Sequence, residues 1–238
     1  MQQTESIFLL DFDGVLCNSL NESLIVSYNT YHKCNLRSIK NISSKECEYF
    51  YNNRWLVRPA GEYFILWKGY ELGININQLM FNKLKTKYHE SISSFHKSFY
   101  NQREELKKNI SYWLSLHKTY DNVKNFLVNT QDKIFIVTNK DERSVVSISK
   151  HFGYFDKIKD IYSMEISFNK KVLVKKIFND YKVNLKEQSI FFIDDNIENL
   201  IEIDSMPEHI NAILATWGYV GNIDRINFKK ITNMDTFI

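Results

Sequence analysis

The stretch Ile7-Phe8-Leu9-Leu10-Asp11-Phe12-Asp13-Gly14-Val15 joins four consecutive apolar residues to two aspartates and a glycine. An apolar run without alternation is typical of a strand that is buried on both faces of a parallel sheet. The abrupt change to Asp11 marks the carboxyl end of that strand, which is where ligands bind in open α/β sheets. The stretch therefore predicts a buried strand that leads directly into a functional loop.

Two later apolar runs repeat this arrangement. Residues 134–137 precede Thr138-Asn139, and residues 190–193 precede Asp194-Asp195. The sequence around these runs has helical periodicity, which predicts helices over residues 120–128, 144–152 and 172–181. A further apolar run predicts another strand over residues 212–215. Alternating strands and helices predict a doubly wound α/β domain.

The first two apolar runs are separated by more than a hundred residues, whereas a βαβ unit needs only about thirty. The excess lacks clear strand runs and is rich in helix formers and aromatic residues. We therefore expect an inserted, mostly helical domain over residues 18–115, with the α/β core formed by residues 1–17 and 116–238.

The composition is that of an ordinary globular protein, with 44% hydrophobic and 25% charged residues among 238. A formal charge of +3 gives no general case for nucleic acid or a membrane surface as a partner. The three cysteines show no metal-type spacing, and their odd number suits free thiols in a reducing compartment. The N-terminal apolar run is too short for a signal segment or a membrane span. We expect a cytoplasmic protein, and its oligomeric state cannot be predicted.

Asp11 and Asp13 stand at positions i and i+2, so their side chains leave a strand in the same direction. One aspartate can attack a phosphorus atom and form an aspartyl-phosphate. The other can protonate the leaving oxygen and then deprotonate the attacking water. Gly14 permits the tight backbone geometry such a loop needs. The alternative is an ordinary surface turn, in which Asp and Gly are common.

The other two strand ends carry complementary chemistry. Thr138 and Asn139 can each donate a hydrogen bond to a phosphoryl oxygen, although turn chemistry alone also explains them. The adjacent carboxylates of Asp194 and Asp195 repel each other unless a cation lies nearby. Magnesium binds oxygen ligands and usually uses one or two carboxylates, so this pair predicts a magnesium site together with Asp11 and the backbone carbonyl of Asp13.

A predicted helix begins near Asn169, whose side chain would cap it. Lys170 or Lys171 at its start could offset the negative charge of the nucleophile and of a phosphate group. Either lysine alone could equally be a solvated surface residue.

Taken in order, four motifs resemble those of the haloacid dehalogenase-like hydrolase superfamily: Asp11-Phe12-Asp13-Gly14-Val15, Thr138-Asn139, Lys170 and Asp194-Asp195. The resemblance is to the phosphatase branch that includes phosphoglycolate phosphatase and β-phosphoglucomutase-like members. It implies a Rossmann-like core with a helical cap inserted directly after the first motif. It also implies a magnesium cofactor and an aspartyl-phosphate intermediate.

The resemblance also implies roles for single residues. Asp11 would be the nucleophile and Asp13 the general acid and base. Thr138 and Lys170 would stabilise the transferring phosphoryl group, and Lys170 fits the family's helix spacing better than Lys171 does. Asp195 would bind the metal directly, and Asp194 would be a second ligand or act through water.

Three positions depart from the family pattern. Asn18 and Asn199 stand where many members have acidic residues, and no proline follows Lys170. None of these departures removes a catalytic group. The second aspartate, Asp13, favours phosphoryl transfer, because dehalogenases of this superfamily lack it.

Arg58 is the candidate substrate contact in the predicted cap. It lies in residues 55–61, where Pro59 and Gly61 interrupt otherwise helical sequence. The ordinary alternative is a charge on a solvated helix face.

The function expected from these patterns is magnesium-dependent hydrolysis of a small phosphate ester, with neither nucleic acid nor membrane as a partner. A phosphomutase that acts on a sugar phosphate would use the same motifs. A non-catalytic binding or regulatory protein on the same fold is the alternative from another class.

Overall fold

The computed structural model describes residues 6–185, 187–221 and 227–237. The chain divides into two compact units. The first unit comprises residues 1–18 and 118–238, and the second comprises residues 19–117. Within the described ranges, none of the helices has the length and apolar character needed to cross a lipid bilayer.

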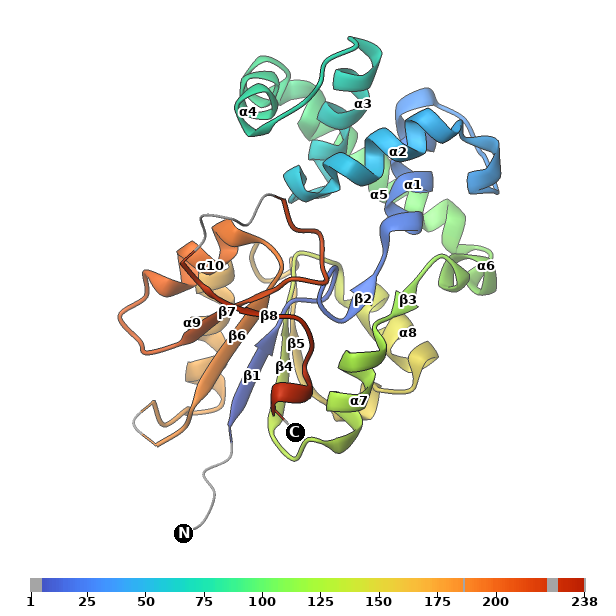
Figure 1. The fold of residues 1–238 in the computed structure, drawn as a ribbon. Helices are drawn as coiled ribbons and strands as arrows, with labels where there is room; N and C mark the ends of the chain where they lie inside the picture. The colour runs from blue at the N-terminus through green and yellow to red at the C-terminus, as the bar shows by residue number, and fades with distance from the viewer. Residues whose placement is uncertain (1–5, 186, 222–226, 238) are drawn as a thin grey trace. The chain divides into compact units, whose positions relative to one another are not determined.

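The first unit is built on a parallel sheet with the strand order β5-β4-β1-β6-β7-β8 (Figure 1). Its strands are β1 (Ile7–Leu10), β4 (Lys133–Val137), β5 (Ile158–Tyr162), β6 (Ile190–Asp194), β7 (Asn211–Ala215) and β8 (Lys229–Ile231). The four predicted strands are confirmed, and so is the predicted α/β fold class. Strand β1 lies between β4 and β6, where Leu10 pairs with both Ile136 and Ile193.

Helices cover both faces of this sheet. Leu9 belongs to the buried cluster that contains Leu173 and Leu200, so α9 and α10 pack on its face. Phe8 points to the opposite face, where its ring lies 4.9 Å from the ring of Phe126 in α7. Burial on both faces explains why β1 lacks polar alternation. The helices are α7 (Asp121–Asn129), α8 (Glu142–Phe152), α9 (Lys170–Asp180) and α10 (Ile197–Asp204), with short 3-10 segments at Phe155–Lys157 and Asp235–Phe237.

A small antiparallel ribbon marks the two places where the chain passes from one unit to the other. It consists of β2 (Cys17–Asn18) and β3 (Lys118–Thr119). Cys17 pairs with Thr119, and Asn18 pairs with Lys118. The chain thus leaves the first unit after β2 and re-enters it at β3, although the 99 residues of the second unit lie between these strands in the sequence.

The second unit is helical in its described elements. It contains α1 (Leu20–His32), α2 (Ser44–Asn53), α3 (Tyr63–Glu71), α4 (Gln78–Lys87), α5 (His89–Lys107) and α6 (Ile110–Ser115), with 3-10 turns at Ile39–Asn41, Arg54–Leu56 and Ala60–Glu62. Phe50 stacks on both Tyr63 and Trp67, and Tyr63 stacks on Phe99. The aromatic residues of this unit therefore form its packed core, as aromatic pairs commonly do.

A buried ion pair connects three helices of the second unit. Arg103 of α5 donates from Nε to Glu22 Oε1 at 2.6 Å and from Nη2 to Oε2 at 3.0 Å. Trp113 of α6 also donates to Glu22 Oε1, at 3.3 Å. Because both carboxylate oxygens accept hydrogen bonds from a bidentate guanidinium, α1 can hold this fully buried charge.

Candidate active site

The strand order brings the predicted site residues to one edge of the sheet. Asp11 follows β1, Thr138 follows β4, and Asp194 and Asp195 stand at the end of β6. Because β4, β1 and β6 are neighbouring parallel strands, their carboxyl ends meet at the same edge. The N–H group of Asp11 continues the ladder by donating to the Ile193 carbonyl at 3.0 Å.

Lys170 contacts two of the acidic groups. Its Nζ lies 2.7 Å from Asp11 Oδ1 and 2.7 Å from Asp194 Oδ2, and the residue is 1% exposed. Asn169 caps α9 through its side chain and so fixes the first turn that carries Lys170. The flanking carboxylates raise the pKa of Lys170 above its ordinary value against the opposing effect of burial. Lys170 therefore stays an ammonium.

The neighbouring lysine is directed elsewhere. Lys171 Nζ donates to Ser205 Oγ at 2.6 Å, beyond the end of α10. The geometry thus separates the two lysines that the sequence left as alternatives: Lys170 is the one among the carboxylates.

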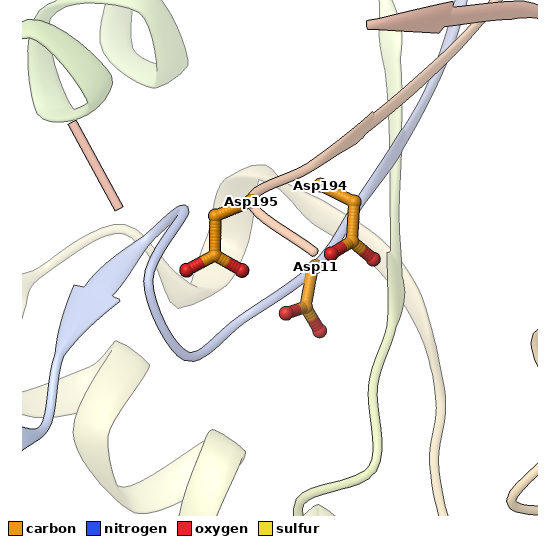
Figure 2. Close-up of side chains that lie close together, drawn as sticks. All are labelled: Asp11, Asp194 and Asp195. Carbon is orange, nitrogen blue, oxygen red and sulfur yellow. The ribbon is translucent and has the colours of Figure 1, made fainter. Parts of the chain in front are cut away.

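Three carboxylates converge at the ends of β1 and β6, as Figure 2 shows for Asp11, Asp194 and Asp195. One oxygen from each lies within 4.8 Å of the others, and all three residues are buried. Burial raises the pKa of Asp11 to about 7, although the Lys170 charge opposes this rise and Asp194 reinforces it. Three buried carboxylates beside the Lys170 ammonium leave an excess of negative charge, and their hard oxygen donors fit a divalent cation such as magnesium.

Asp194 is held by several donors. Its Oδ1 accepts from the Asn196 N–H group at 2.8 Å, and its Oδ2 accepts from Asn199 Nδ2 at 3.0 Å as well as from Lys170. Asn199 thus orients Asp194 without adding another negative charge to the cluster.

Asp195 is enclosed by two glycines. A Cβ atom on Gly14 would lie 2.0 Å from Asp195 Oδ2, and one on Gly218 would lie 2.3 Å from Asp195 Cβ. Gly14 also has a φ of 95°, which L side chains rarely adopt. The N–H group of Tyr219 donates to Asp195 Oδ2 at 2.5 Å. Gly218 and Tyr219 therefore pack directly against the Asp195 carboxylate.

Asp13 pairs with a lysine that the sequence patterns did not single out. Lys140 Nζ lies 3.1 Å from Asp13 Oδ1 and 3.2 Å from Asp13 Oδ2. Lys140 is 3% exposed and follows Thr138-Asn139 directly. The available signal was a lysine three residues beyond the end of a buried strand, and a solvated turn explains such a lysine equally well.

Thr138 and Asn139 occupy the turn after β4. Thr138 Oγ1 accepts from the Lys140 N–H group at 3.1 Å, while its own N–H group donates to the Tyr162 carbonyl at 2.9 Å. Among the described residues, the buried Oδ1 atom of Asn139 has no hydrogen-bond partner. Arg58 belongs to the second unit, where its N–H group donates to Glu62 Oε2 at 3.0 Å. The substrate-binding roles of these three residues stay predictions.

Searches by sequence find neither a matching family model nor a curated relative. Solved structures do match the fold. A haloacid dehalogenase-like hydrolase from Bacteroides fragilis aligns over 98% of this chain and all of its own, with a TM-score of 0.68 and 13% identity. The chain has the fold of the haloacid dehalogenase-like hydrolases.

Two other matches belong to the same fold group. A haloacid dehalogenase-like family protein from Streptococcus pneumoniae aligns over 97% of this chain and 95% of its own, with a TM-score of 0.62 and 13% identity. A predicted phosphoglycolate phosphatase from Haemophilus somnus aligns over 94% of this chain and 90% of its own, with a TM-score of 0.61 and 18% identity. The predicted resemblance is therefore confirmed for the fold.

Proposed function

We propose that this protein hydrolyses phosphate monoesters of small molecules, with Asp11 as the nucleophile. The observation that carries this proposal is the buried Asp11 carboxylate at the end of the central strand, 2.7 Å from the Lys170 ammonium and within the acidic cluster. The likeness to solved hydrolases and phosphatases adds support. Asp13, two residues further on, supplies the second carboxyl group that hydrolysis in two steps requires.

In the first step, an Asp11 oxygen bonds to phosphorus and the ester P–O bond breaks. Asp13 gives its proton to the leaving oxygen, so the alcohol departs and phosphorylated Asp11 remains. In the second step, water bonds to phosphorus and passes a proton to Asp13. The bond between Asp11 and phosphorus breaks, which releases phosphate and restores both carboxyl groups. Lys170, Thr138 and Asn139 would stabilise charge on the phosphoryl oxygens.

A divalent metal ion, which we propose to be magnesium, would be held by Asp11, Asp195 and Asp194, together with the Asp13 carbonyl. When bound, it would supply positive charge that offsets the excess of carboxylates and the charge of the phosphoryl group. The second unit would act as the cap, and Arg58 would contact the part of the substrate away from the ester.

The test is phosphate release from a panel of phosphate monoesters that includes aryl phosphates, sugar phosphates and small phosphorylated acids. We expect release with magnesium, and we expect its loss with a chelator and its recovery when magnesium is restored. Calcium should support little activity, because it prefers a larger and less regular set of ligands. No phosphate from any ester with magnesium present would overturn the proposal. A rearranged sugar phosphate instead of free phosphate would point to a mutase.

Replacing Gly218 by alanine should impair this activity without removing any charged group. The added Cβ would meet Asp195 Cβ at 2.3 Å and the Gly14 carbonyl oxygen at 2.5 Å, so the metal-binding carboxylate must move. A displacement of 1 Å can lower a rate by about 100-fold, which is the loss we expect in kcat/KM. Gly73→Ala is the control for backbone strain away from the acidic cluster: a Cβ there meets no atom within 4 Å, but a φ of 64° strains an alanine, so thermal unfolding of both variants is measured beside activity. Equal activity in the two variants would contradict a tightly enclosed Asp195.

A further inference from the structure

Lys140 is a buried charged residue to which the proposed mechanism assigns no part. Its side chain is 1% exposed, and the Asp13 side chain that it contacts is 23% exposed. One ammonium group lies within 3.2 Å of both Asp13 oxygens. These two contacts keep both carboxylate oxygens close to one fixed positive charge and so restrain the position of the Asp13 carboxyl group.

The backbone on both sides of Lys140 is fixed. Its N–H group donates to Thr138 Oγ1 at the end of β4. The next residue, Asp141, is the N-cap of α8 and accepts from the Ser144 N–H group at 2.9 Å. Lys140 therefore projects from a short turn between a strand and a helix, and its position is set by both.

The two buried lysines contact different carboxylates. Lys170 contacts Asp11 and Asp194, whereas Lys140 contacts Asp13. Burying an ammonium is costly unless it is paired with an opposite charge, so each lysine is matched to the carboxylates that it contacts. The proposed nucleophile, Asp11, and the proposed acid-base group, Asp13, are thus paired with different lysine ammonium groups.

We propose that Lys140 is a positioning residue for Asp13, aiming its carboxyl group at the leaving oxygen. This inference rests on the proposed function. As the ester P–O bond breaks, the Asp13 proton moves to the leaving oxygen and a carboxylate remains on Asp13. Lys140 keeps its own protons and stabilises that carboxylate. When water later attacks phosphorus, its proton returns to Asp13.

This role makes a specific prediction about leaving groups. An alkoxide is a poor leaving group and must be protonated as it departs, whereas a nitrophenolate leaves readily without a proton. Loss of correct acid catalysis lowers rates by about 100-fold to 10,000-fold where protonation is needed. The loss of kcat/KM on replacing Lys140 should therefore depend on the alcohol that is released.

The experiment compares Lys140→Met with wild type on benzyl phosphate and 4-nitrophenyl phosphate, two substrates of similar size. We expect kcat/KM to fall by about 100-fold or more for benzyl phosphate and by less than about 10-fold for 4-nitrophenyl phosphate. Asp13→Asn should show the same selectivity, and the double variant should lose little more than Asp13→Asn alone. Lys140→Arg should recover part of the benzyl phosphate activity, since it keeps the positive charge.

Lys150→Met is the matched control, because Lys150 lies on the exposed side of α8 and should leave both rates unchanged. Equal losses on the two substrates, or losses that multiply in the double variant, would overturn the positioning role. If Lys140→Met does not fold, Lys140→Arg decides: an unselective loss overturns the role, and a loss confined to benzyl phosphate supports it. A wild type that releases no phosphate from either substrate, or from the wider panel, would instead overturn the proposed function.

Discussion

Asp11→Asn is expected to lower phosphate release by about 10⁴-fold or more, since removing the nucleophile of a covalent mechanism costs factors of this size or larger. The amide matches the carboxylate in size but is a far weaker nucleophile. The variant should fold, because the substitution also removes one of three buried carboxylates that lie within 4.8 Å of one another. Phosphate release and thermal unfolding measure the two effects separately.

The matched control for this substitution is Asp156→Asn, because Asp156 is an exposed aspartate of the same unit. It should keep the wild-type rate. Mass spectrometry after rapid acid quench provides a second readout: the wild type should gain one phosphoryl group during turnover, and Asp11→Asn should gain none. Turnover by Asp11→Asn close to the wild-type rate would exclude Asp11 as the nucleophile.

Lys170→Met should impair both activity and stability. Loss of a preorganised charge that stabilises the transition state lowers kcat by about 100-fold to 1,000-fold. Breaking a buried ion pair by removing one partner lowers the free energy of unfolding by about 3 to 5 kcal/mol. Both effects follow from the 2.7 Å contacts of Lys170 with Asp11 and Asp194, which would lose their shared cation.

The stability loss in Lys170→Met should depend on pH. Burial raises the pKa of Asp11 from 3.8 to about 7 even with Lys170 present. The folded state thus binds the Asp11 proton more tightly than the unfolded chain does, and this group's contribution to stability falls as pH rises from 3.8 to about 7. Without the Lys170 charge, the pKa of Asp11 in the folded state rises further. The contribution of Asp11 to the free energy of unfolding then keeps falling up to a higher pH.

Denaturant unfolding without added metal should therefore show a larger difference between wild type and Lys170→Met at about pH 8 than at about pH 5, where Asp11 is protonated. Lys171→Met is the control, because Lys171 contacts Ser205 rather than the acidic cluster. A difference that does not change with pH would mean that Asp11 and Lys170 are not coupled in solution.

The sequence predicts the central strands well because burial on both faces leaves a strong signal. Residues 7–10, 134–137 and 190–193 are continuous apolar runs, and all three form strands next to one another. The two edge strands, β5 and β8, were not predicted. They carry exposed polar residues such as Asp160 and Lys229, so only their pairing with β4 and β7 identifies them as strands.

The sequence motifs identify Asp11, Lys170, Asp194 and Asp195, because each of these residues stands at the end of a predicted strand or at the start of a predicted helix. The sequence does not predict a site role for Lys140, because its partner, Asp13, is 127 residues away in the sequence. The packing of Gly218 against Asp195 could not be predicted either, since the close approach of two residues that are distant in the sequence does not change the local composition around them. Long-range contacts of this kind depend on strand order, which short motifs do not specify.

The pairing of Asn18 with Lys118 has a consequence for how the chain could be re-engineered. Paired strands lie about 5 Å apart, so the 99 residues of the second unit begin and end at neighbouring points. A two-residue turn such as Asn-Gly is long enough to join β2 to β3. The insertion is therefore a cassette: it could be excised, or exchanged for another fold with adjacent termini, without altering the strand order of the sheet.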